Sequence, residues 1–303
     1  MKQNKVSLIC PIYNEVDSIK GLMDSMLKQT KKPEEIIFVD SFSNDGTAEI
    51  IKDYSKRYPQ IKIIQKRSNI AKARNIAVKN AKNEIIACTD AGCQLNRNWL
   101  EEITKPFPKY DFVAGNYGFL AKNDFEFFQG NFVVQDVDKV TRISSRSIAF
   151  KKAFWKKARG YPENTYTGED TNFNFRLLNA GAKLFYAKKA ILKWKMRPTW
   201  GKFAKQFYLY GFGDGKMRNI FKIKTNAISF IGFLILILAG LVFLFINAWI
   251  SLVVLLLLVG FFSFEGLILW KKTKKFRGFF YGFLLSLIKR KSYALGVLIG
   301  LLK

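Results

Sequence analysis

The chain has 303 residues, no histidine and a net charge of +27 at neutral pH. The lack of histidine excludes Ser-His-Asp and Cys-His catalytic groups and every histidine-containing metal site, which leaves carboxylates, lysines and backbone amides for chemistry. The three cysteines, Cys10, Cys88 and Cys93, have neither the spacing of a disulfide framework nor that of a zinc site. Cys10 and Cys88 each end an apolar run, so we expect these two to be small core residues, and a reducing cytoplasm fits.

Short apolar runs alternate with segments of helical periodicity over the first ninety residues. The predicted strands are 6–10, which Pro11 ends, then 35–40, 61–65 and 84–89. The predicted helices are 16–28, 47–57 and 70–81. This alternation indicates parallel βαβ units, in which ligands bind beyond the carboxyl ends of the strands.

Acidic residues follow three of the predicted strands. Glu15 follows the first, Asp40 ends the second and Asp90 follows the fourth. A single Asp in such a place is commonly a helix cap or a turn former, and Asp45 is interpreted in that way. Carboxylates at three strand ends of one parallel sheet are expected to converge on one crevice.

Two hydrophobic runs in the last third of the chain, 227–246 and 249–270, are each long enough to cross a bilayer as a helix. The short break between them predicts an antiparallel hairpin. Cations flank the pair on both outer sides, so the positive-inside rule places the N-terminal domain on the cytoplasmic side of the cell membrane. A buried helical hairpin in a soluble protein is the alternative.

The remaining segment, 276–303, is also apolar, but Lys289, Arg290 and Lys291 divide it. Three cations at mid-membrane are costly, so two short helices in the interface are predicted rather than a third span. No cleaved signal peptide is visible at the N-terminus.

Positive charge accompanies these hydrophobic segments. Residues 1–170 carry 28 Lys and Arg against 21 Asp and Glu, whereas residues 171–303 carry 22 against 2. Such an excess is typical of a surface that faces anionic lipids. Nucleic-acid binding is the competing interpretation of a basic chain, and we do not expect it because no recognition motif is present.

Five motifs, in this order, resemble those of glycosyltransferase family 2, the nucleotide-sugar enzymes of the GT-A fold. They are Pro11-Ile-Tyr-Asn-Glu15, Val39-Asp-Ser-Phe-Ser-Asn-Asp-Gly-Thr47, Ala73-Arg-Asn75, Thr89-Asp-Ala-Gly-Cys93 and Thr167-Gly-Glu-Asp170. The resemblance covers most of residues 5–215. It implies an α/β, Rossmann-like GT-A catalytic domain over residues 1–222. The hydrophobic runs described above then place a membrane anchor over residues 223–303.

The resemblance also implies a donor site. Its expected residues are Pro11, Tyr13, Glu15, Asp40, Arg74 and Asp90. Asp40 would lie near the base, and Arg74 near the base or the diphosphate. Asp90 would bind a divalent cation bridged to the diphosphate, and its oxygen ligands suit Mg²⁺ or Mn²⁺.

Two departures from the family's pattern concern this metal. Gly92 stands where the family usually has a second Asp, so Asp90 would be the only protein carboxylate on the cation. Lys193-Trp194 falls where many relatives carry a metal-binding His. A metal-independent variant is therefore the alternative.

Asp170 is the expected catalytic base, because the family places the base in this Glu-Asp pair. A positioned carboxylate can accept the proton that an acceptor hydroxyl loses as it attacks. Glu169 would support the site rather than perform this step. The alternative interpretation of residues 167–170 is a helix N-terminus whose acids complement the helix dipole.

Other substrate contacts are expected on the resemblance alone. Residues 115–129 and 144–146, including Arg146, would line the acceptor side. In related enzymes a basic, aromatic segment like 197–215 closes over the donor diphosphate, and the candidates here are Arg197, Lys205, Gln206 and Tyr210. The same composition also fits an interfacial helix with aromatic side chains among lipid headgroups.

The function predicted from these features is an inverting, membrane-bound transfer of a sugar from a nucleotide sugar. Inversion is implied by the family. The acceptor would be a hydroxyl or a phosphate, and the membrane anchor favours a lipid-linked one, such as a polyprenyl phosphate or a lipid-bound glycan. The alternatives are a nucleotidyltransferase-like enzyme and a non-catalytic scaffold that binds a nucleotide sugar.

Overall fold

The computed structural model describes residues 5–134, 143–164, 167–221 and 247–303, with the short pieces 230–232, 234–235, 238–240 and 242. The chain divides into two compact units. The first consists of Met1–Phe119 and Gln135–Lys195, and the second of Leu120–Val134 and Met196–Lys303. The boundary expected after residue 222 lies outside the described residues and stays a prediction.

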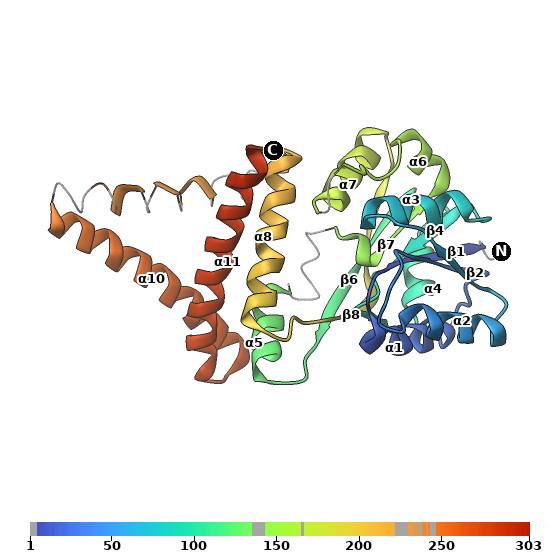
Figure 1. Cartoon of the computed structure of the whole chain (residues 1–303), viewed down its shortest axis with the longest axis horizontal. Helices are drawn as coiled ribbons and strands as arrows, with labels where there is room; N and C mark the ends of the chain where they lie inside the picture. The colour runs from blue at the N-terminus through green and yellow to red at the C-terminus, as the bar shows by residue number, and fades with distance from the viewer. Residues whose placement is uncertain are drawn as a thin grey trace. The chain divides into compact units, whose positions relative to one another are not determined.

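The first unit is built on a mixed sheet, which has eight strands among the described residues (Figure 1). The spatial order of the strands is β3-β2-β1-β4-β7-β6-β8-β5. Their bounds are β1 Val6–Ile12, β2 Glu35–Asp40, β3 Ile61–Gln65, β4 Ile85–Cys88, β5 Cys93–Leu95, β6 Phe112–Leu120, β7 Ile148–Lys151 and β8 Leu184–Lys195. The first four strands run parallel, and β7 pairs antiparallel to both β4 and β6. The predicted parallel βαβ units are therefore confirmed.

Helices pack on both faces of this sheet because its strands are apolar on both sides. On β1, Leu8 and Cys10 belong to one buried cluster together with apolar residues of α1, whereas Ile9 belongs to another with alanines of α3. The helices of this unit are α1 Val16–Leu27, α2 Thr47–Arg57, α3 Ile70–Asn80, α4 Trp99–Thr104, α6 Lys152–Lys157 and α7 Glu169–Asn179, with a 3₁₀ turn at Ser145–Ser147. All three predicted N-terminal helices are confirmed to within one residue, and all three cysteines are buried and free.

The first strand continues through Pro11 to Ile12, so the prediction that Pro11 ends it is wrong. Ile9 O accepts a hydrogen bond from Thr89 N on the β4 side, and Ile12 O accepts one from Ser41 N on the β2 side. Residue 11 has the same orientation as residue 9, and β4 ends at Cys88, opposite Ile9. The nitrogen of Pro11 therefore faces the β4 side beyond the end of β4, where no strand carbonyl would accept a hydrogen bond. The lack of an N–H at Pro11 thus costs the sheet no hydrogen bond.

The second unit is helical. Its described helices are α5 Asp124–Val133, α8 Trp200–Lys216, α10 Ala248–Thr273 and α11 Arg277–Leu301, with a 3₁₀ turn at Asn219–Phe221. Within the described part of the chain, one helical segment, Trp249–Thr273, is long and apolar enough to cross a membrane, with a mean hydropathy of 2.6. The predicted second span lies in this helix. Most of the predicted first span lies outside the described residues, so the hairpin stays a prediction.

Helix α11 is continuous, so the prediction of two short helices over residues 276–303 is wrong. Lys289, Arg290 and Lys291 lie inside this helix because Lys and Arg are good helix formers. They interrupt the run of apolar residues, but they do not interrupt the helical backbone. Arg290 pairs with Glu265 of α10 at 3.4 Å, and the ammonium of Lys289 lies over the rings of Phe132 and Phe207.

Helices α8 and α11 approach each other through glycines. A Cβ added at Gly211 would lie 2.1 Å from Tyr293 O, and one added at Gly296 would lie 2.1 Å from Tyr208 O. Gly215 and Gly300, one turn further along each helix, meet the partner backbone in the same way. Small residues four apart on both helices allow this backbone contact.

Candidate active site

Arg74 is the central residue of an acidic cluster in the first unit. It lies on α3 with a side chain only 2% exposed. Its Nη2 donates to Asp90 Oδ1 at 2.7 Å, and its Nη1 donates to Glu169 Oε1 at 2.7 Å. Burial by itself would lower the pKa of Arg74, but the neighbouring acids, Asp90 foremost, raise it well above its usual value. Arg74 therefore stays charged. It joins Asp90, which follows β4, to Glu169, the first residue of α7.

Glu169 and Asp170 open α7 directly after Gly168, whose φ of 80° lies in the left-handed region that favours glycine. Glu169 is buried, and burial, then the charge of Asp170, raises its pKa to about 7 against the opposing effect of Arg74. Asp170 is half-buried, and its Oδ1 accepts a hydrogen bond from Thr171 N at 2.7 Å. The predicted helix start is thus confirmed, and the two acids differ in environment.

Asp90 begins the turn between β4 and β5. Its backbone carbonyl accepts from Cys93 N at 3.1 Å, and its side chain is 27% exposed. The described ion pair with Arg74 uses Oδ1 and not Oδ2, and a carboxylate oxygen is the kind of donor that suits Mg²⁺ or Mn²⁺. Across the described residues, no group of three or more His, Cys, Asp or Glu gathers to hold a metal ion. A Cβ at Gly92 would meet only Lys195 Cβ at 3.9 Å, so packing alone does not require glycine there.

The loops after β1 and β2 are tied to each other. Asn14 N donates to Ser43 Oγ at 2.9 Å, and Glu15 N donates to Thr47 Oγ1 at 2.9 Å. Asp45 Oδ1 accepts from both Thr47 N and Thr47 Oγ1, which confirms its interpretation as a turn former. Glu15 is half-buried and accepts from the hydroxyl of Ser18.

Asp40 is completely buried at the end of β2. It accepts from Ser43 N at 3.1 Å, from Ser43 Oγ and from Gln65 Nε2 at 3.0 Å. These bonds fix the start of the β2 loop and connect it to β3. In the joined loops after β1 and β2, Tyr13 is 57% and Phe42 52% exposed. Phe42 has a φ of 61°, which is unusual for a bulky residue and presents an aromatic side chain next to this loop pair.

Arg146 packs against two aromatic rings of β6 and β8. Its guanidinium carbon is 3.8 Å from the ring centroid of Trp194 and 4.9 Å from that of Tyr117. Trp194 of β8 pairs with Cys93 of β5, and Cys93 follows Asp90 by three residues in the chain. Arg146 is thereby held by two aromatic rings and by Ser144 Oγ at 3.0 Å from its Nε.

The second unit contains the other two candidates, Arg197 and Gln206. Gln129 binds the backbone of Arg197 twice, accepting from its N–H at 2.8 Å and donating to its carbonyl at 3.0 Å. Arg197 Nε donates to Gln206 Oε1 at 3.2 Å, and Gln206 Nε2 donates to Tyr210 Oη at 2.8 Å. Both glutamines are buried, so the guanidinium is fixed within this unit.

The predicted site residues thus fall into defined groups. Arg74, Asp90 and Glu169 are in direct contact, and Asp170 follows Glu169 in the same helical turn. Asp40 ends β2, and Glu15 lies in the loop after β1. Strand β1 lies between β2 and β4 and runs parallel to both, so the carboxyl ends of these strands share the edge from which Asp90 projects. Pro11 lies in β1, and Tyr13 lies in the loop that follows.

Several contributing residues were not identified from the sequence. Tyr161 stacks on Phe173 at 3.8 Å between centroids and lies beneath the Arg74 guanidinium at 5.3 Å. Gln65 and Gln129 anchor Asp40 and Arg197. An aromatic residue or a glutamine gives no local sequence signal of such a role, because the contact depends on distant segments meeting.

Comparisons with known proteins identify the family of the chain. The profile of Glycosyl transferase family 2 matches residues 7–167, more than half of the chain. Glycosyltransferase AglE of Haloferax volcanii is 26% identical over 214 residues, covering 67% of this chain and 70% of that protein. The dolichyl N-acetyl-alpha-D-glucosaminyl phosphate 3-beta-D-2,3-diacetamido-2,3-dideoxy-beta-D-glucuronosyltransferase of Methanococcus voltae is 26% identical over 249 residues, covering 71% and 74%.

A likeness to a solved structure supports the fold. The crystal structure of S. aureus TarS 1-349 in complex with UDP-GlcNAc aligns with a TM-score of 0.54 at 18% identity, covering 74% of this chain and 75% of that one. The mixed sheet with its covering helices is therefore the GT-A fold that the sequence motifs predicted. The chain belongs to glycosyl transferase family 2 and is a glycosyltransferase.

Proposed function

We propose that this glycosyltransferase is membrane-bound and inverting, and that it moves a sugar from a nucleoside diphosphate to a hydroxyl or phosphate of a lipid-linked acceptor. One observation carries the proposal. Buried Arg74 joins Asp90, at the edge of the sheet where donors bind, to Glu169, which precedes Asp170 at the start of α7. A donor-binding carboxylate and a candidate base are thus held in one fixed cluster.

The donor side is assigned to Asp90, Arg74 and the joined loops that carry Glu15 and Asp40. Because Asp40 is buried and fully hydrogen-bonded by Ser43 and Gln65, its part is to fix the loop that receives the nucleoside. The Asp90 carboxylate, which is 27% exposed, would hold a divalent cation. Such a cation neutralises charge on the departing diphosphate.

Asp170 is assigned as the base. Glu169 is occupied by Arg74, and its raised pKa reflects burial, whereas Asp170 is half-exposed and available to a substrate. The acceptor O–H gives its proton to the Asp170 carboxylate while the oxygen bonds to the anomeric carbon. The bond from that carbon to the diphosphate oxygen breaks on the opposite face, which inverts the configuration. An acceptor that is a phosphate is already ionised, and Asp170 would then orient it.

The membrane part of the proposal rests on Trp249–Thr273 and on the cations beside it. The name of the Methanococcus relative specifies a dolichyl-linked phosphate sugar, which makes a polyprenyl-linked acceptor the class to test. We assign the catalytic domain to residues 1–222, on the cytoplasmic side, and the anchor to residues 223–303.

The test is a screen of nucleotide sugars with the purified full chain in detergent, with Mg²⁺ or Mn²⁺ and lipid-phosphate or lipid-glycan acceptors. Release of nucleoside diphosphate measures turnover, and the anomeric configuration of the product distinguishes inversion from retention. The variant Asp90→Asn should weaken Mn²⁺-dependent donor binding, while Asp53→Asn on the exposed face of α2 should not. If no nucleotide sugar is bound or turned over with any acceptor, the proposal fails.

A further inference from the structure

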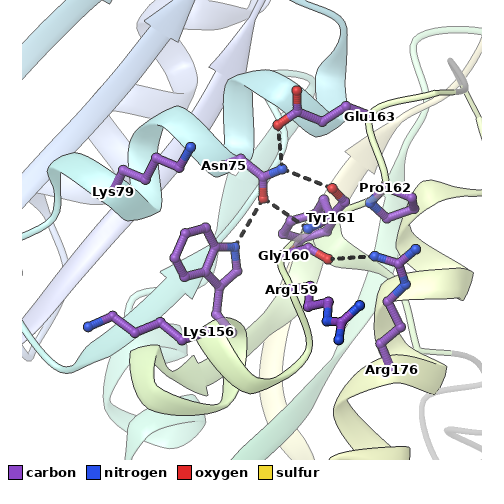
Figure 2. Close-up of a pocket in the computed structure, with 10 residues that line it drawn as sticks. Asn75, Lys79, Lys156, Arg159, Gly160, Tyr161, Pro162, Glu163 and Arg176 are labelled. Atoms are coloured by element: carbon purple, nitrogen blue, oxygen red, sulfur yellow. Dashed lines mark hydrogen bonds between the residues drawn. The ribbon is translucent and has the colours of Figure 1, made fainter.

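A pocket lies in the first unit, and Tyr161, whose ring faces Arg74 of the acidic cluster, is one of the residues that line it. It has a volume of about 480 Å³ and is formed by the end of α3, by α6 with the loop after it, and by Arg176 of α7 (Figure 2). This volume is typical of a small-molecule site and exceeds what a bare inorganic ion needs. None of the residues assigned to sugar transfer lines it.

The wall of the pocket is built around Asn75. Its Nδ2 donates to Tyr161 O at 2.9 Å and to Glu163 Oε1 at 2.8 Å, and its Oδ1 accepts from Trp155 Nε1 at 3.0 Å and from Tyr161 N at 2.9 Å (Figure 2). The amide thereby uses both donors and both acceptor positions. A Cβ at Gly160 would lie 2.7 Å from Asn75 Oδ1, so the loop can press against this wall only with glycine there. The cavity is therefore preformed.

The charges around this wall are strongly unbalanced. Four cationic side chains line the pocket, namely Lys79, Lys156, Arg159 and Arg176, against the single acid Glu163. Glu163 is engaged by Asn75, and Arg176 donates from Nε to Asn172 Oδ1 at 3.1 Å. Within the described part of the chain, no ion pair neutralises Lys79, Lys156 or Arg159. Three cations thus remain available to a ligand.

Arg159 also has an unusual backbone. Its φ is 58° and that of Gly160 is 67°, so two successive residues lie in the left-handed region. A non-glycine residue is strained there, and such strain is found where a side chain serves a function. The turn keeps Arg159 beside the pocket instead of continuing α6.

We propose that this pocket binds a phosphate-bearing anion of sugar-phosphate size, at a site separate from the donor site. Phosphate offers several acceptor oxygens and up to two negative charges, which matches clustered Lys and Arg donors. The source of the phosphate is a free phosphorylated sugar or the headgroup of an anionic lipid. Tyr161 separates the two sites, because its backbone belongs to the pocket wall and its ring faces Arg74.

The experiment is calorimetric titration of the full chain in detergent with glucose 1-phosphate and with dihexanoyl phosphatidic acid. Glucose and dihexanoyl phosphatidylcholine serve as the negative controls, because neither carries an anionic phosphomonoester. The pocket variant is the double substitution Lys79→Glu with Lys156→Glu. Its matched control is Lys20→Glu with Lys52→Glu, which changes the net charge equally at exposed positions of α1 and α2. Melting curves verify that both variants are folded.

The wild-type protein and the control should bind at least one phosphate probe, and the pocket variant should bind it at least about tenfold more weakly. The probe that binds more tightly identifies the source of the phosphate. A second pocket variant, Arg159→Gly, removes the charge and relieves the backbone strain, so weaker binding in that variant cannot be attributed to misfolding. Equal loss of affinity in pocket variant and control, or no binding of either phosphate probe by the wild type, would overturn the proposal.

Discussion

Arg74 and Glu169 lie 95 residues apart in the chain and meet at 2.7 Å between Nη1 and Oε1, both almost completely buried. The opposite end of the same guanidinium holds Asp90. A planar guanidinium can serve two carboxylates at once, which a lysine cannot do with the same geometry. One side chain therefore connects the turn after β4 to the start of α7.

We expect Arg74→Met to destabilise the protein by about 3–5 kcal/mol, because it leaves buried acidic groups without their partner. Arg74→Lys should be intermediate, since it retains the charge but loses one of the two contacts. Denaturation of the first unit, followed by tryptophan fluorescence, measures the effect. Adding Glu169→Gln to Arg74→Met should recover part of the loss, because one unpaired charge is removed. Simple additivity of the two substitutions would contradict the coupling.

The raised pKa of Glu169 predicts a pH dependence of stability. Its pKa lies near 4.5 when exposed and near 7 in the folded protein. The folded state therefore binds the proton more tightly, and this contribution to stability is complete below pH 4.5 and lost as the pH rises through 7. The shift corresponds to about 3 kcal/mol.

Melting temperatures of the wild type and of Glu169→Gln between pH 5 and 8 test this contribution. The wild type should lose stability relative to the variant as the pH rises, because the neutral amide does not titrate. Parallel pH profiles of the two proteins would show that Glu169 titrates normally.

For catalysis, Asp170→Asn should lower the transfer rate to a hydroxyl acceptor by about 10²–10⁴-fold and leave donor affinity nearly unchanged. The amide keeps the size of the side chain but cannot accept the proton. Single-turnover rates and equilibrium donor binding separate the two effects, and Asp53→Asn serves as the surface control. Loss of donor binding with an intact fold would reassign Asp170 to the donor site.

The close packing of α8 and α11 predicts that Gly296→Leu strongly destabilises the helical unit. The new side chain would overlap the backbone of α8 at Tyr208, so the helices must separate. The control Gly201→Ala lies on α8, has no atom within 4 Å of its added Cβ and should be neutral or slightly stabilising. Thermal aggregation in detergent compares the two variants. Similar melting temperatures would show that the glycine contact is dispensable.

Much of the first unit follows from local sequence. The periodicity of residues 6–89 predicts alternating strands and helices, and their parallel order then places Glu15, Asp40 and Asp90 at one edge of the sheet. These features depend on side-chain periods and on the connection rules of βαβ units, both of which act over short stretches of chain. The ordered motifs add the family and the expected role of Asp170.

Other features depended on the tertiary structure. Arg74 could be expected near the donor, but its buried contact with both Asp90 and Glu169 requires α3, β4 and α7 to meet. Pro11 can lie inside a strand only because β4 ends beside it, and the charged residues of α11 can lie inside a helix because Glu265 and aromatic rings receive them. The cations that line the pocket around Asn75 likewise come from three helices and a loop. Sequence patterns indicate which residues a segment can bury, whereas long-range packing decides which side chains meet. The energy of a buried charge depends on the charged partner that this packing supplies.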